Sequence, residues 1–169
     1  MTPRGMSRVV VIVTLVLLSG CSPGIVQSTQ LSALDPATTQ IEYRFNDSSV
    51  PPEYHRSFTV NARSGEASIV VDSYGEVLNE ESSGIDDQTW RMLVAAAADL
   101  DVASTGESEG CTGGTSRELR ISEADAPPVL DVRVAVCGGN GQGQAEHIDT
   151  YVAPLFALFD MESLVTVSN

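Results

Sequence analysis

The chain has 169 residues, of which 42% are hydrophobic and 19% are charged, and its formal net charge at pH 7 is −14. This length suits a single domain with a hydrophobic core of useful size. Nucleic acid and anionic lipid surfaces would repel so acidic a chain, so neither is expected as a partner.

The N-terminal residues 1–20 have the pattern of a secretory signal. Arg4 and Arg8 form a positively charged region before an apolar run at residues 9–18. This run is shorter than the roughly 20 residues of a membrane-spanning helix. The run ends in LSGC, which resembles the bacterial lipobox and predicts cleavage before Cys21 and lipidation of its thiol. An ordinary secretory signal ending near a cysteine is the alternative. The mature protein is expected at the extracytoplasmic face of the cell membrane, anchored by its acyl chains.

Removing residues 1–20 changes the charge balance further. Seven arginines, no lysine and 23 acidic residues remain, which gives a net charge of −16. Residues 21–38 are small and polar with two prolines, so they are predicted to be the lipidated cysteine and a flexible tether. Residues 39–169 are predicted to form one domain.

The first half of this domain alternates like a half-buried β-sheet. In QIEYRFND, residues 40–47, apolar Ile41, Tyr43 and Phe45 alternate with polar residues, which predicts a strand. Further strands are expected over residues 54–61 and 66–72, and a short one through Val77 and Leu78.

The period then changes to that of a helix. Asp86 is the expected N-cap, and a staple between Ile85 and Trp90 is predicted. The helix should pack through one face, which consists of Trp90, Leu93, Val94, Ala97 and Leu100.

The second half supplies two more strands and one more helix. Strands are predicted over residues 116–122 and 129–137, and a C-terminal helix over residues 147–161. Pro154 must kink that helix or mark a restart. The order ββββ-α-ββ-α predicts an α+β fold, with an antiparallel sheet of about five to six strands and two helices packed on one face.

The cysteines predict one disulfide. With Cys21 lipidated, Cys111 and Cys137 remain in an oxidising compartment, where they most simply pair. Closing a loop of roughly 27 residues would stabilise the fold by about 3.5 kcal/mol in the chain-entropy model. The alternative is a two-thiol metal site, but it has neither a CxxC spacing nor paired histidines.

The segment SVPPEYHRS, residues 49–57, is the most unusual stretch of the sequence. Its two prolines fit a loop that leads into an edge strand. Arg56 shares the strand parity of Phe58, which favours a structural clamp on carboxylate or carbonyl oxygens over a binding role or exposure. His55 points the other way, with only Glu53 as a local acid and no evident nucleophile. A satisfied or exposed histidine is therefore favoured over a catalytic base.

Other common sites lack their signatures. His55 and His147 do not have the spacing of metal ligands, and the chain contains no calcium-loop motif. The glycine-rich stretches after Cys111 and Cys137 lack the Lys-Ser/Thr ending of a phosphate loop. No metal, cofactor or catalytic residue is therefore predicted.

Three motifs occur together: SVPPEYHRS, CTGGT at residues 111–115 and CGG at residues 137–139. In combination they resemble an uncharacterised family of small secreted or lipid-anchored bacterial domains that carry SVPPxYHRS, CTGGT and CGG. The resemblance covers about residues 39–162. It implies an α+β domain with a bridge between the two cysteine motifs, and it implies no activity. It also implies a spatial cluster, serving as a structural knot or a binding site, of Tyr54, His55, Arg56, Thr112 and Thr115.

These observations favour a non-enzymatic bacterial lipoprotein, a binding or interaction module whose partner is an envelope protein. Two alternatives stay open. One is an enzyme or enzyme accessory that uses His55, Arg56 and a threonine of the CTGGT loop. The other is an inhibitor of an extracellular hydrolase that displays VPPEY, residues 50–54.

Overall fold

The computed structural model describes residues 29–104, 113–124 and 126–166. Six strands form one antiparallel sheet in the order β4-β3-β2-β1-β5-β6. The strands are β1 (Thr39–Asn46), β2 (Ser57–Arg63), β3 (Glu66–Ser73), β4 (Glu76–Ser83), β5 (Thr115–Glu123) and β6 (Leu130–Val136). The helices are α2 (Asp87–Ala96), the short 3₁₀ helix η1 (Ala97–Asp99), α3 (Gln142–Phe156) and α4 (Met161–Val165).

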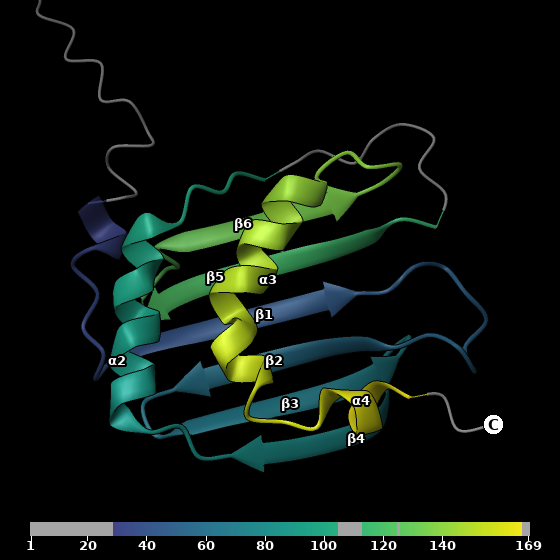
Figure 1. Ribbon diagram of the computed structural model, residues 1–169, viewed down its shortest axis with the longest axis horizontal. Coiled ribbons are helices and arrows are strands. Elements are labelled where there is room, and N and C mark those ends of the chain that lie inside the picture. Colours follow the sequence, from purple (N-terminus) through teal and green to yellow (C-terminus); the bar gives the residue numbers. More distant parts are fainter. Residues whose placement is uncertain (1–28, 105–112, 125, 167–169) are drawn as a thin grey trace, which may run out of the picture.

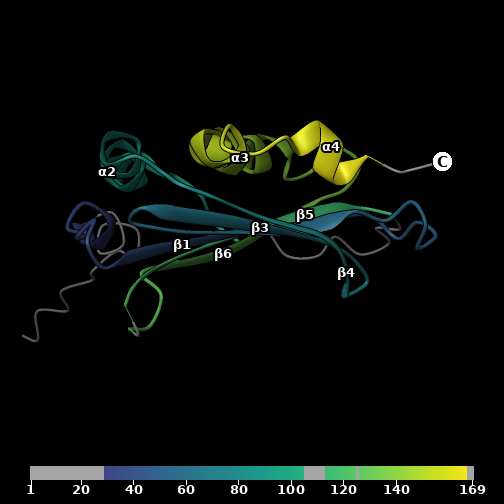
Figure 2. The same ribbon diagram turned by 90° about the horizontal axis from the view of Figure 1, so that it is seen from below.

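Helices α2, α3 and α4 all lie on one side of the sheet (Figure 2). The predicted α+β class, with an antiparallel sheet and helices on one face, is confirmed. The predicted order is incomplete, because a second C-terminal helix, α4, follows α3. We call the side of the sheet that carries no helices the open face.

The core lies between the sheet and the helices, and the strand register builds it in rows. One row crosses five strands, because Tyr43 lies opposite both Val60 and Leu119, which in turn lie opposite Ile69 and Val132. All five side chains are buried. The apolar residues that alternate along β1 therefore form the middle of a continuous apolar layer.

Helix α2 begins as its sequence predicts. The Asp86 carboxylate accepts hydrogen bonds from the backbone N–H of Thr89 at 2.9 Å and from its hydroxyl at 2.7 Å. These bonds hold the pKa of Asp86 below its ordinary value, because they favour the charged carboxylate. Trp90 on the inner face is fully buried, and its indole N–H donates to the Pro36 carbonyl at 2.7 Å.

The Pro36 contact shows that the domain begins earlier than the sequence pattern indicates. Leu31 is 2% exposed and belongs to the core, and the N–H of Ala124 donates to the Thr38 carbonyl. Residues 29–38, which were predicted to be tether, thus pack on the domain. Only residues 22–28 remain between Cys21 and the described domain, and seven residues reach at most roughly 25 Å.

The C-terminal helix also starts earlier than expected, at Gln142, and it continues through Pro154. Proline has no N–H to donate to the carbonyl one turn back, and α3 ends two residues later. The chain restarts as α4, where the Asp160 carboxylate accepts from the N–H of Ser163 at 3.1 Å.

Candidate functional site

The loop between β1 and β2 carries three of the residues singled out from the sequence. The N–H groups of Tyr54 and His55 both donate to the carbonyl of Pro51, which winds the chain into a compact turn. Strand β2 therefore begins at Ser57, three residues later than predicted. Arg56 lies one residue before β2, so the parity used to place its side chain was extended beyond the strand.

His55 is a buried residue, 5% exposed, and its ring stacks on Tyr74 at 3.9 Å between ring centroids. Its Nε2 lies 3.3 Å from the hydroxyl of Ser57, and its Nδ1 has no hydrogen-bond partner in the described chain. Ser57 is itself buried and accepts the N–H of Asp47. A catalytic base needs a group that orients it and a nucleophile that a substrate can reach. Among the described residues no acid lies at Nδ1 of His55, and both His55 and Ser57 are buried.

Arg56 makes one hydrogen bond through its side chain and one through its backbone. Its guanidinium donates to the carbonyl of His55 at 2.7 Å, and its own N–H donates to Asp47 Oδ2 at 2.9 Å. The carbonyl belongs to the preceding residue, so this bond is local, and the predicted clamp role of Arg56 stays a prediction. The Tyr54 side chain is 56% exposed.

The β3–β4 turn fastens this loop from the other side. The hydroxyl of Ser73 donates to the Pro52 carbonyl at 2.7 Å, and that of Tyr74 donates to the Val50 carbonyl at 2.6 Å. Tyr74 has a left-handed φ of 51°, a conformation uncommon outside glycine. We call residues 47–57 together with Ser73 and Tyr74 the loop knot. Sequence reasoning missed Tyr74, because its partners lie about 20 residues away in the chain.

Thr115 belongs to a different structure, at the start of β5. Its hydroxyl accepts from Arg117 Nη1 at 2.7 Å, and Arg117 Nε donates to Asp149 Oδ2 at 3.1 Å. The hydroxyl of Tyr43 donates to Asp149 Oδ1 at 2.7 Å. We call Tyr43, Arg117 and Asp149 the α3 clamp, because they join β1 and β5 to α3. Burial and the adjacent Asp149 carboxylate raise the pKa of Tyr43, so its hydroxyl stays protonated and donates.

Of the SVPPEYHRS segment, Ser49 alone lines a cavity that it shares with residues 113–115 of the CTGGT loop. A cavity of about 240 Å³ lies between Asn46, Asp47 and Ser49 on one side and residues 113–116 on the other. Tyr54, His55 and Arg56 do not line this cavity. Cys21, Cys111 and Thr112 lie outside the described residues, so their predicted roles stay predictions.

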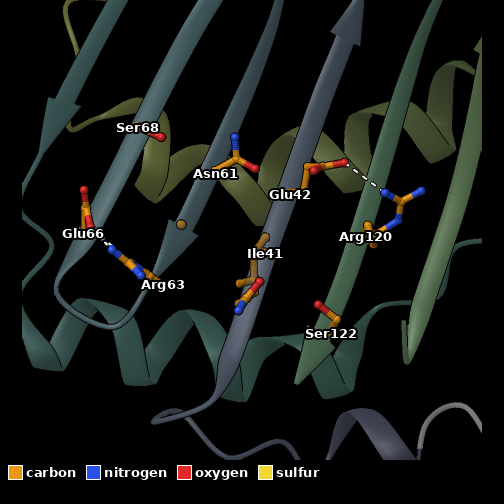
Figure 3. Close-up of a pocket in the computed structure, with 10 residues that line it drawn as sticks. Ile41, Glu42, Asn61, Arg63, Glu66, Ser68, Arg120 and Ser122 are labelled. Atoms are coloured by element: carbon orange, nitrogen blue, oxygen red, sulfur yellow. Dashed lines mark hydrogen bonds and ion pairs between the residues drawn. The ribbon is translucent and has the colours of Figure 1, made fainter. Parts of the chain in front are cut away.

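A larger depression of about 370 Å³ lies on the open face (Figure 3). We call it the open-face groove. It crosses β1, β2, β3 and β5 and lies between two ion pairs, Arg120–Glu42 at 3.3 Å and Arg63–Glu66 at 2.6 Å. Between the pairs lie side chains that make no hydrogen bond to another described residue, namely those of Gln40, Asn61, Ser68 and Ser122. The groove therefore combines paired charges with available donors and acceptors.

Arginines are concentrated on the open face. Four of the seven arginines of the predicted mature chain project there from the sheet, and all four form ion pairs. The pairs are Arg44–Asp72, Arg63–Glu66, Arg120 with both Glu42 and Asp131, and Arg133–Glu118. The Asp72 carboxylate is buried, but the other pairs are exposed, and exposed pairs contribute little to stability. Stability alone therefore does not account for the concentration of arginine here.

Two observations concern other kinds of site. The described residues contain no group of three or more His, Cys, Asp or Glu side chains that could hold a metal ion. Among the described helices, none has the length and apolar character needed to cross a membrane.

The chain was also compared with known proteins. No protein-family model matches it, and no curated protein matches it either.

Proposed function

We propose that this protein is a lipid-anchored, non-catalytic interaction module at the extracytoplasmic face of the cell membrane. Its open face binds an envelope protein. The observation that carries the proposal is the open-face groove, where paired arginines surround amide and hydroxyl groups that have no partner within the described chain. The LSGC sequence supports the anchor, and the short segment before residue 29 would hold the domain close to the membrane.

The chemistry of the groove suits a polar protein surface of mixed charge. Arginine is enriched at protein interfaces, and its guanidinium has five donors, so a paired Arg120 or Arg63 retains donors for a partner. The Asn61 and Gln40 amides offer both donors and acceptors. On the open face the arginines offset the charge of nearby carboxylates. The open face would therefore repel an acidic partner less than the remaining surface of the mature chain, which has a net charge of −16 in total.

The loop knot supports a non-catalytic role. His55 and Ser57 are buried against each other, and Arg56 is engaged with a backbone carbonyl. The segment VPPEY is wound into a turn, whereas a segment that pairs with an enzyme as an added strand is extended. These contacts favour a structural role for the loop over the enzyme and inhibitor alternatives.

We also propose that Cys111 and Cys137 form a disulfide. Support comes from the strand register, because Thr115 lies opposite Val136, the residue before Cys137. Cys111 precedes Thr115 by only four residues, which span at most roughly 14 Å. The two cysteines are thereby kept within a distance that a short loop can close.

Photo-cross-linking tests the binding face. The chain has no lysine, so amine-reactive reagents are unsuitable, and a photo-reactive residue in place of Ser68 reports directly on the groove. Replacing Ser163 on α4, an exposed serine on the helical side, is the matched control. We expect one envelope protein to cross-link in intact cells from position 68 and not from position 163. Equal labelling from both positions would contradict a specific role for the open face.

A further inference from the structure

A second groove lies on the helical side of the molecule, away from the open face. It has a volume of about 540 Å³ and runs between α2 and α3, the two helices that lie next to each other in Figure 1. Its walls repeat at helical spacing, with residues 89, 92, 93 and 96 on α2 and residues 147, 150, 151 and 154 on α3. Positions i, i+3, i+4 and i+7 form one stripe along a helix, so the groove follows both helix axes. We call it the helical groove.

The lining of the helical groove is mainly apolar. Met92 is 57% exposed there, beside Leu93, Ala96 and Pro154. In a chain of such high net charge, an apolar depression open to solvent is a candidate binding surface. Tyr151 also lines the groove, and its buried hydroxyl has no hydrogen-bond partner within the described ranges. Nothing in the described interior thus explains why this position carries a polar group.

Charge is confined to one end of the helical groove. Asp99 and Asp101 lie where α2 and η1 end, and His147 lies on the facing side. No arginine is among the described residues that line the groove. An occupant should therefore be apolar along its length and should carry positive charge, not negative charge, near Asp99 and Asp101.

We propose that the helical groove binds an amphipathic helix of a partner protein, through an apolar ridge with basic residues beside the end that lies near Asp99 and Asp101. The two stripes line a channel between α2 and α3. A bound helix fills such a channel with a ridge of side chains at positions i, i+3, i+4 and i+7, which is the helix-in-groove mode of recognition. Helix α2 has ten residues and is about 15 Å long, which corresponds to nearly three turns of a bound helix. Ala96 lets the backbone of that helix approach closely, and Met92 adapts its shape to the anchors.

This inference does not depend on the proposed function of the open face. The two grooves lie on opposite sides of the sheet and share no lining residue. A protein with both would bridge two partners at the membrane surface. A substitution in one groove leaves the other intact, so a failure of either proposal is distinguishable from a failure of the other.

Binding of designed peptides tests the proposal. One peptide of about 18 residues, long enough to form a helix in isolation, carries a leucine ridge flanked by lysines. A second has glutamates in place of the lysines, and a third has the composition of the first with the ridge scrambled. Affinities are measured by fluorescence anisotropy with the mature chain and with Ala96→Arg. The matched control is Ala95→Arg, because Ala95 is exposed on the same helix and does not line the groove.

We expect the lysine-flanked helix to bind at least about tenfold more tightly than either other peptide. Ala96→Arg should weaken that binding at least about tenfold and Ala95→Arg less than about twofold, with unchanged thermal unfolding in both variants. Binding of the scrambled peptide as tight as that of the first, no binding of the first, or equal effects of the two substitutions would overturn the proposal. Uptake of the neutral dye N-phenyl-1-naphthylamine that is lost in Ala96→Arg, without peptide binding, would identify a small-molecule site and also overturn it.

Discussion

Replacing Asp149 by alanine is expected to lower the free energy of unfolding by about 3 kcal/mol. Asp149 accepts from the hydroxyl of Tyr43, which is 1% exposed, and pairs with Arg117. Removing the carboxylate leaves a buried donor unsatisfied and a largely buried guanidinium without its charge partner. The Asp149 side chain is 33% exposed, so solvent screens part of the effect and the low end of the range for broken buried pairs applies.

Asp131→Ala is the matched control for this change. Asp131 also pairs with an arginine, Arg120 at 3.3 Å, but both side chains are about half exposed. Its loss should cost less than about 1 kcal/mol. Urea unfolding of the two variants and of Tyr43→Phe, which deletes only the hydroxyl, separates the contributions. If Asp149→Ala cost no more than Asp131→Ala, the α3 clamp would not hold α3 to the sheet.

Loss of the proposed disulfide should have an effect of similar size, about 3.5 kcal/mol for a loop of roughly 27 residues. The single variants Cys111→Ala and Cys137→Ala should each cost nearly as much as the double variant, since either one breaks the bridge. Denaturant unfolding with and without a reductant provides the measurement, and the double variant should be insensitive to the reductant.

Peptide mapping gives an independent test of the bridge. Trypsin cleaves after Arg117 and Arg133, which lie between the two cysteines, so the flanking peptides separate unless a disulfide joins them. A joined pair that separates on reduction is the expected result. Alkylation of both thiols in the denatured, unreduced protein would disprove the pairing.

Local periodicity was sufficient to predict most of the fold. The alternation around Tyr43, the Asp86 cap and the apolar face of α2 each depend on a few neighbouring residues, and the structure confirms them. Ala97 and Leu100, which were predicted on the same helix face, lie beyond the end of α2. The packing of Leu31 was missed, because Leu31 and Leu34 are too few in a short polar stretch to establish a period. The α4 helix was missed, because only five residues form it.

The candidate sites needed tertiary information. His55 was expected to be satisfied or exposed, and the ring that covers it, Tyr74, comes from a turn formed by two other strands. The alternation of side chains along each strand could have placed Arg44, Arg120 and Arg133 on one face of the sheet. Their ion-pair partners could not be predicted in this way, because these depend on the register of five strands. The helical groove depends on how α2 lies beside α3, and no local pattern encodes that arrangement.

The most direct test of the anchored interaction module compares the cross-link from position 68 in cells that make the protein with Cys21 and in cells that make Cys21→Ser. With Cys21, we expect the chain in the membrane fraction, with a mass increase for the acylated cysteine, and cross-linked to one envelope protein. With Cys21→Ser, we expect a soluble chain and loss of that product. An unmodified Cys21, or the same product at the same yield from both forms, would contradict the account.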